Sequence, residues 1–422
     1  MTSNTTAGKF KGDRVIWTVF FFLCIISIIE VFSASSGLSF KSGDYLKPVL
    51  KHCLLLGFGV AAMICTMNVK CKYFKIVTPF ALFFSFLGLI AVFFLGEATG
   101  DAQRWMSLFG IQFQPSEFAK GALILATAQI LSALQTSEGA DRRAFKYILI
   151  VCLFIIPPIA VENLSTAILL GAVVFMLMFI GKVPKGQLGK LLGVVMLSAT
   201  LFFGLIMMLG NAEKEDEGKT AKNTVTEQVE KREETKVEKV FHRFGTWKNR
   251  ILRFTNNKEI APEDVDLDKD AQVAHANIAI ASSNLVGKGP GNSVERDFLS
   301  QAFSDFIYAI IIEEMGIWGA TFVCFLYIIL LFRTAAIASR CVNTFPALLI
   351  MGFALLLVAQ AMFNMAVAVG LAPVTGQPLP LISKGGTSTI VNCVYIGIIL
   401  SVSYSAKKKD DTDELTTQPA KA

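Results

Sequence analysis

Long apolar runs constrain this chain more than any other feature. A helix needs about 20 predominantly apolar residues to cross the hydrocarbon core of a bilayer. Ten stretches reach or approach that length: 15–35, 49–68, 76–96, 117–134, 147–162, 166–182, 188–210, 303–332, 344–370 and 386–405. Because backbone groups in lipid must be paired internally, we expect an all-α polytopic membrane protein with ten transmembrane helices.

Lysine and arginine in the short loops give the orientation. Cytoplasmic loops carry an excess of these residues, and long loops are exempt from the rule. Six groups alternate with loops poorer in positive charge: Lys9, Lys11 and Arg14; Lys70, Lys72 and Lys75; Arg142, Arg143 and Lys146; Lys182, Lys185 and Lys190; Arg333 and Arg340; and Lys407, Lys408 and Lys409. We therefore expect both termini in the cytoplasm, with 97–116, 163–165, 211–302 and 371–385 facing outward.

The outward segment between the seventh and eighth spans differs in composition from the rest. Residues 211–300 hold 32 of the 72 charged residues, and its first part, 211–239, predicts either a solvated helix or disorder. In 240–254 apolar residues recur at helical spacing beside Arg and Lys, which favours a helix lying at the membrane surface over a soluble helix packed on the loop. Residues 272–289 predict a re-entrant or surface-packed helix followed by a tight turn at Gly287-Lys288-Gly289.

The domain organisation follows from these spans. We expect one integral-membrane domain over 1–405, which includes the large loop 211–302. The charged tail 406–422 is expected to be cytoplasmic and disordered. With so basic a set of loops explained by topology, the net charge of +6 does not indicate a nucleic-acid partner.

Ionisable side chains within the apolar spans are candidate site residues, because burying them in hydrocarbon is costly. They are Glu30, Glu117, Lys120, Asp305, Glu313 and Glu314. Glu117 and Lys120 share one helix face and lie, like Asp305, near the outer ends of their spans. The plainer alternative is an intrahelical ion pair, with Asp305 stabilised by the helix dipole. Glu313 and Glu314 lie deeper, and we expect them to hold helices together.

Two outward segments add further candidates. Arg104 has the planar fork that suits a phosphate or pyrophosphate, whereas Trp105 beside it is either a substrate contact or an interfacial anchor. The segment 373–386 contains three Pro and three Gly, together with Ser383 and Lys384. Such rigid, apolar, non-helical backbone is tolerated at membrane depth only where it is buried in protein or lines a watery cavity.

Four motifs in order resemble the SEDS family (shape, elongation, division and sporulation). They are Gln103-Arg104-Trp105 with Gln114-Pro115-Ser116-Glu117 and Lys120; Ile278-Ala279-Ile280 with Gly287-Lys288-Gly289; Ser304-Asp305-Phe306 with Glu313-Glu314-Met315-Gly316; and Pro378 to Gly386. The resemblance covers about residues 12–405, and the Thr375 to Pro380 loop resembles the division branch more than the elongation branch. The chain departs from the family pattern at Glu162-Asn163, Ser304 and Lys384.

The resemblance implies a peptidoglycan glycosyltransferase that polymerises lipid II by one inverting displacement. Asp305 is then the expected general base. Arg104, Lys120 and, more weakly, Lys288 are expected to bind the pyrophosphate, with Glu117 holding Lys120 and with Trp105, Ser383 and Lys384 as further substrate contacts. A divalent cation, Mg²⁺ or Mn²⁺, is allowed with Asp305 as a ligand, and no organic cofactor is expected.

The resemblance also implies partners and a compartment. We expect a class B penicillin-binding transpeptidase, other division proteins and membrane lipids as partners. The expected location is the bacterial inner membrane, with the active site on its extracytoplasmic side. Two alternatives remain: a lipid II transporter (flippase), and a non-catalytic scaffold for a penicillin-binding protein. The transporter fits less well, because transporter sites lie near the midplane and these candidates lie at the outer ends.

Overall fold

The computed structural model describes residues 11–42, 46–99, 102–108, 111–209, 248, 271–299 and 304–417. The chain divides into two compact units, one formed by 1–188 with 265–422 and the other by 189–264. The predicted segments 211–239 and 240–254 lie outside the described residues, except for Lys248. The membrane-surface helix therefore stays a prediction.

All ten predicted spans fall on helices. These are α1 (Arg14–Ser42), α2 (Leu46–Met67), α3 (Cys71–Leu95), α4 (Pro115–Ala133), α5 (Arg142–Glu162), α6 (Leu164–Ile180), α7 (Lys185–Leu209), α10 (Ile307–Ala338), α11 (Thr344–Ala368) and α12 (Thr387–Thr417). Within the described ranges, eight of them are long and apolar enough to cross a bilayer. The other two are α6, which is apolar but shorter, and α4, which carries Glu117 and Lys120 in its first two turns. The protein is thus a mostly helical, multi-pass membrane protein.

The expectation of an all-α fold is wrong between α3 and α4. There the chain forms an antiparallel sheet of three strands, β1 (Glu97–Thr99), β2 (Ala102–Leu108) and β3 (Ile111–Phe113), in the order β1-β2-β3. Strand pairing satisfies the backbone groups of this segment, which is too short and too polar to continue a membrane helix. Strands of three to seven residues leave almost no periodic signal in the sequence, so the apolar pattern predicts only a loop between the two helices.

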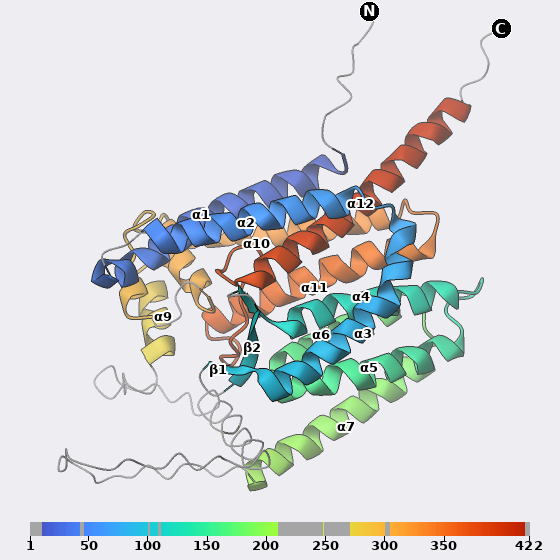
Figure 1. Ribbon diagram of the computed structural model, residues 1–422, viewed down its shortest axis with the longest axis horizontal. Coiled ribbons are helices and arrows are strands. Elements are labelled where there is room, and N and C mark those ends of the chain that lie inside the picture. Colours follow the sequence, from blue (N-terminus) through green and yellow to red (C-terminus); the bar gives the residue numbers. More distant parts are fainter. Residues whose placement is uncertain are drawn as a thin grey trace, which may run out of the picture. The chain divides into compact units, whose positions relative to one another are not determined.

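In the larger unit, α11 is the central helix. About 72% of its apolar stretch is buried, compared with 22% for α2 and for α5. It packs against α10, α4, α6 and α12, while α2 packs closely along α12 (Figure 1). The strands and α9 (Ala271–Ala281) lie at one end of this unit, on the left of Figure 1. The candidate residues at the start of α4 and of α10 belong to that end.

At the other end of α10, contacts of Asp13 join this helix to α1 and α12. The Arg333 guanidinium donates to both oxygens of Asp13, with the shortest contact at 2.6 Å, and this joins the end of α10 to the start of α1. Burial raises the pKa of the Asp13 carboxyl, but the hydrogen bonds and charge of Arg333 and two backbone N–H groups outweigh burial and leave the pKa below its ordinary value. Ser403 also binds the Asp13 backbone N–H, at 3.0 Å, which adds α12 to this end of the unit.

The α12 helix continues beyond its apolar part to Thr417. Residues 406–417 are therefore helical in a segment for which we expected disorder.

The α10 helix is broken at Gly316, whose φ of 70° and ψ of −173° are not helical. The predicted turn after α9 fills the break with its own backbone. The N–H groups of Lys288 and Gly289 donate to the carbonyls of Glu313 and Glu314, at 3.0 and 2.8 Å. Beyond the break, the N–H groups of Ile317 and Trp318 donate to the carbonyls of Asn284 and Leu285, at 3.4 and 3.3 Å. The turn thus supplies the partners that the broken helix lacks.

Gly287→Ala tests this close approach. A Cβ at Gly287 would lie 2.4 Å from the Glu314 carbonyl oxygen and 2.4 Å from the Gly316 nitrogen. The control is Gly291→Ala, because Gly291 also has a positive φ but a Cβ there meets nothing within 4 Å. Backbone strain should cost each variant about 1–2 kcal/mol. We expect Gly287→Ala to lose about 1–3 kcal/mol more, measured by thermal unfolding in detergent. Equal losses in the two variants would contradict the packing described here.

Candidate functional site

Asp305 lies immediately before the first turn of α10. Its neighbour Phe306 is buried against Leu299, Ala309 and Ile310, which anchors this end of the helix. The Asp305 side chain is half-buried, and the Ser304 hydroxyl donates to its Oδ1 at 2.9 Å. Asp305 is therefore a half-buried carboxylate just before a helix start, at the end of α10 that lies away from Arg333.

The backbone around Asp305 is held by side chains from distant parts of the chain. The Asn364 amide of α11 donates to the Asp305 carbonyl at 2.9 Å and to the Gln377 carbonyl at 2.7 Å. The Ser383 hydroxyl donates to the Ser304 carbonyl at 2.6 Å and accepts the Leu379 N–H at 2.8 Å. Asn364 was not among the candidates singled out from the sequence. The only indication of its role there is that it is a polar amide inside an otherwise apolar span.

The segment 371–386 is non-helical and largely buried, as its Pro and Gly content predicts. Its backbone carbonyls are tied down by side chains of neighbouring helices. Gln360 of α11 donates to the Pro378 carbonyl at 3.1 Å, and Tyr327 of α10 donates to the Pro380 carbonyl. The Gln377 side chain in turn donates to Thr166 of α6 at 2.8 Å. This segment therefore connects α6, α10 and α11, and through Ser383 it also contacts the backbone next to Asp305.

Glu117 and Lys120 form the predicted pair, with 2.7 Å between Lys120 Nζ and Glu117 Oε1. Lys120 is only 1% exposed and also donates to Gln360 Oε1 at 2.8 Å. The Tyr395 hydroxyl of α12 donates to the Glu117 carbonyl at 2.5 Å. In this geometry the pair ties α4 to α11 and α12, and the predicted contact of Lys120 with substrate remains a prediction.

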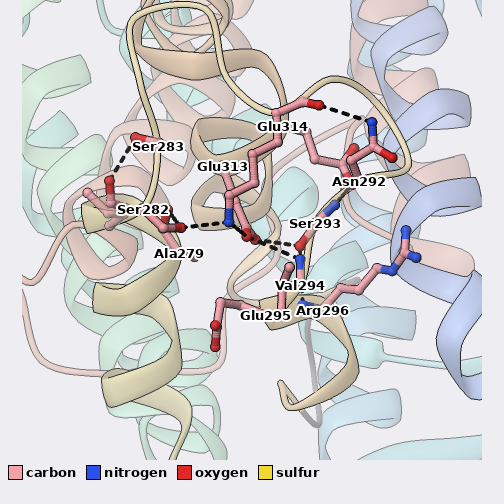
Figure 2. A network of polar contacts seen from close by, with 12 residues as sticks. Ala279, Ser282, Ser283, Asn292, Ser293, Val294, Glu295, Arg296, Glu313 and Glu314 are labelled. Carbon is pink, nitrogen blue, oxygen red and sulfur yellow. Dashed lines mark hydrogen bonds and ion pairs between the residues drawn. The ribbon is translucent and has the colours of Figure 1, made fainter.

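Glu313 binds the turn that fills the break in α10 (Figure 2). Its carboxylate accepts the Ser293 hydroxyl at 2.5 Å and the Val294 N–H at 3.1 Å. Lys288 forms an ion pair with it, with 2.6 Å between Nζ and Oε1, and also donates to Ser282 at 2.9 Å. The Lys288 side chain is 29% exposed. It lies with this turn, and its predicted binding of pyrophosphate remains a prediction.

Glu314, the next residue of α10, binds the same loop. Its carboxylate accepts the N–H groups of Gly291 at 3.1 Å and Ser293 at 3.2 Å, and the hydroxyl of Ser33 in α1. Glu314 thus joins α10 to α1, in line with the contact between helices expected from the sequence, and both carboxylates also hold the loop after α9 to α10. Glu30 of α1, also buried, has no hydrogen-bond partner for either carboxylate oxygen among the described residues.

The remaining candidates lie in the two outward segments. Trp105 is half-buried in β2, where its register partner is Glu97 of β1. Arg104 precedes it in the same strand, and its side chain lies outside the described part of the structure. Lys384 is half-buried one residue after Ser383; burial lowers the pKa of its amine, and the charge of Lys51 lowers it further.

The donor set near Asp305 bears on a divalent cation. The described residues contain no group of three or more His, Cys, Asp or Glu side chains placed to hold a metal ion. Magnesium in phosphate-handling sites commonly uses only one or two protein carboxylates and takes its other ligands from phosphate and water. A single carboxylate such as that of Asp305 would meet this limited requirement, and the metal remains a prediction.

Lys120→Met tests whether the buried pair is structural. The substitution leaves Glu117 as an uncompensated buried charge, which we expect to lower the free energy of unfolding by about 3–5 kcal/mol. The double variant Glu117→Gln, Lys120→Met should regain much of that loss, because it removes both charges. The control Lys146→Met, at an exposed lysine, should change stability by less than about 0.5 kcal/mol. A loss for Lys120→Met no larger than that of the control would refute the structural role.

Comparison with known proteins gives matches over nearly the whole chain. The sequence model of the family described as "Cell cycle protein" (FtsW, RodA and SpoVE) matches residues 13–408. The chain is 28% identical over 405 residues to the "Probable peptidoglycan glycosyltransferase FtsW" of Geobacter sulfurreducens, covering 94% of this chain and 96% of that protein. It is 25% identical over 413 residues to the "Peptidoglycan glycosyltransferase MrdB" of Escherichia coli K12, covering 96% and 98%.

Solved structures show the same fold. A chain from "Structural coordination of polymerization and crosslinking by a peptidoglycan synthase complex" superimposes with a TM-score of 0.69 at 21% identity, covering 94% of this chain and 98% of that one. The rod shape determining protein RodA of Thermus thermophilus gives a TM-score of 0.59 at 20% identity, covering 93% and 96%. At these identities the likeness concerns the arrangement of helices.

Proposed function

The chain belongs to the FtsW, RodA and SpoVE family of cell cycle proteins, and from this membership we propose its reaction. It is a peptidoglycan glycosyltransferase, in agreement with the curated names of its FtsW and MrdB relatives. The proposed substrate is lipid II, a disaccharide-peptide linked to undecaprenyl pyrophosphate. The observation that carries the proposal is the family match over 13–408, which includes every candidate site residue.

In the proposed reaction, the acceptor hydroxyl attacks the anomeric carbon of the donor sugar. A C–O bond forms to the acceptor, the C–O bond to the pyrophosphate breaks, and undecaprenyl pyrophosphate leaves. Because the donor linkage is α and the product linkage is β-1,4, one displacement with inversion is sufficient. Pyrophosphate is a good leaving group and needs no strong acid. The difficult steps are removal of the acceptor proton and neutralisation of the leaving group.

Asp305 is the proposed general base. It is a half-buried carboxylate at the outer start of α10, and the Ser304 hydroxyl donates to its Oδ1 at 2.9 Å. A carboxylate oxygen placed against the acceptor hydroxyl can accept its proton. Glu117, Glu313 and Glu314 are each buried and used by other contacts, so they suit this role less well.

The charge of the pyrophosphate calls for cations at the same end. Arg104, Lys288 and Lys384 are the proposed contacts: Lys288 is partly exposed, and Lys384 follows Ser383, which contacts the backbone beside Asp305. Trp105 in β2 is proposed to line the substrate path. A Mg²⁺ or Mn²⁺ ion held by Asp305 and substrate oxygens would supply further neutralisation of the pyrophosphate charge.

The proposed setting is the bacterial inner membrane, with ten spans, both termini in the cytoplasm and the site on the extracytoplasmic side. The supporting observations are that Lys- and Arg-rich loops alternate along the chain with loops poorer in positive charge, and that Arg333 and Asp305 lie near opposite ends of α10. We further propose a role in septal synthesis, together with a class B penicillin-binding transpeptidase and other division proteins. The FtsW names of several relatives support this assignment.

Asp305→Asn tests the reaction. The substitution preserves size and removes the base, so we expect purified protein to polymerise lipid II about 10²–10⁴-fold more slowly. The matched control is Asp13→Asn, at a carboxylate in the other end of the unit. The control should retain most of the activity. Polymerisation should be followed by gel separation of glycan strands made from labelled lipid II.

The same assay separates the proposal from its alternatives. Adding a purified transpeptidase should not restore glycan synthesis to Asp305→Asn. A transporter would make no polymer with either variant, and would move lipid II across vesicle membranes instead. A scaffold would tolerate Asp305→Asn when the transpeptidase is present. Full activity of Asp305→Asn would overturn the role of this residue, and absence of polymer from the unaltered protein would overturn the proposed reaction.

A further inference from the structure

Two consecutive backbone carbonyls at Asp305 are held by side chains that lie far away in the sequence. The Ser304 carbonyl accepts the Ser383 hydroxyl at 2.6 Å, across 79 positions. The Asp305 carbonyl accepts the Asn364 amide at 2.9 Å, across 59 positions. Both donors are buried, Ser383 at 3% and Asn364 at 1% exposed. These contacts lie before the first turn of α10 and are separate from the hydrogen bonds of the helix itself.

These carbonyls belong to the two peptide units on either side of the Asp305 Cα. The Ser304 carbonyl lies in the peptide plane that leads into Asp305, and the Asp305 carbonyl lies in the plane that leads out of it. Because a peptide unit is planar, restraining both carbonyls restrains φ and ψ at Asp305. The direction of the Cα–Cβ bond follows from those two angles. The contacts therefore fix the direction in which the side chain leaves the backbone, and the Ser304 hydroxyl bound to Oδ1 favours one orientation of the carboxylate about its own torsions.

Each donor is itself held in place by a second contact. The Asn364 amide nitrogen has two N–H groups and uses the other for the Gln377 carbonyl, at 2.7 Å. The Ser383 hydroxyl oxygen accepts the Leu379 N–H at 2.8 Å. Both second contacts go to the buried segment 371–386, which Gln360 and Tyr327 tie to α11 and α10. The direction of Asp305 is thus set by a rigid part of the interior.

We propose that Asn364 and Ser383 are positioning residues, which aim the Asp305 carboxylate at the acceptor hydroxyl. The inference rests on the proposed role of Asp305 as general base. Ser383, expected from the sequence to bind substrate, acts instead through the backbone of Ser304. A group displaced by about 1 Å from the reactive geometry loses about 10²-fold in rate. Loss of the Asn364 or Ser383 hydrogen bond should therefore affect turnover more than substrate binding.

The main test uses Ser383→Ala, with Ser388→Ala as the matched control. Ser388 is also buried in this part of the chain and also donates to a backbone carbonyl, that of Gly385 at 2.8 Å, but it does not touch Ser304 or Asp305. We expect Ser383→Ala to lower kcat about 10-fold with KM for lipid II within about 2-fold of the original value. The two variants should have similar melting temperatures, and Ser388→Ala should keep its kcat.

Asn364 is tested with two variants. Asn364→Asp keeps the size but places a carboxylate against two carbonyls, and we expect kcat to fall about 100-fold. Asn364→Ser introduces no charge and is the milder change. Its hydroxyl is too short to bridge both carbonyls, so we expect kcat to fall about 10-fold. If Asn364→Asp does not fold, Asn364→Ser alone decides this arm. An unchanged kcat in the folded Ser variant would overturn the role of Asn364.

The decisive readout is the combination with Asp305→Asn. A positioning residue acts only through the group that it positions, so Ser383→Ala should not lower the residual rate of Asp305→Asn any further. A purely structural defect would reduce the rate of the unaltered protein and the residual rate of Asp305→Asn by the same factor. That result would overturn the proposal. If Asp305→Asn itself retains full activity, the role of Asp305 as base fails. If Asp305→Asn is impaired and Ser383→Ala matches Ser388→Ala, only the positioning role fails.

Discussion

The structure depends first on the lack of water in the bilayer core, where each unpaired backbone N–H or C=O costs several kcal/mol. A continuous helix meets this constraint by itself, but the part of this protein that carries the candidate site is not continuous helix. The α10 helix breaks at Gly316, and the turn after α9 supplies the missing partners for Glu313, Glu314, Ile317 and Trp318. The segment 371–386 meets the same requirement with side chains, since Gln360, Asn364 and Tyr327 donate to its carbonyls.

The same constraint explains why charged residues inside the spans are poor guides to chemistry when taken alone. Lys120 is buried between Glu117 and Gln360, and Glu313 and Glu314 bind the turn that fills the break in α10. Each is expensive to bury, and each is paired by the fold. Asp305 differs, because it lies just before a helix start and is half-buried, whereas those side chains are buried. Exposure and placement, more than charge, separate it from the others.

Much of the fold was predictable from apolar run length, because a membrane helix requires a long stretch that few other structures need. All ten runs are helices, and the turn after α9 follows its glycines. The three short strands at 97–113 were missed, because segments of this length carry almost no periodicity. Of the site, Asp305 and the Glu117–Lys120 pair could be predicted. Asn364 could not, because a single amide in an apolar run does not indicate which distant carbonyls it will meet.

Run length and composition were enough to identify a membrane protein, its helices and its chemical groups. Run length and the placement of Lys and Arg are local properties, so no tertiary contact is needed to recognise them. Tertiary structure decided which groups are used internally and which remain available. Burial and pairing are properties of packed neighbours: Ser383 and Asn364 reach Asp305 only because α11 and the segment 371–386 pack beside the start of α10. These two hydrogen bonds, across 59 and 79 positions, fix the direction in which the Asp305 side chain leaves the backbone.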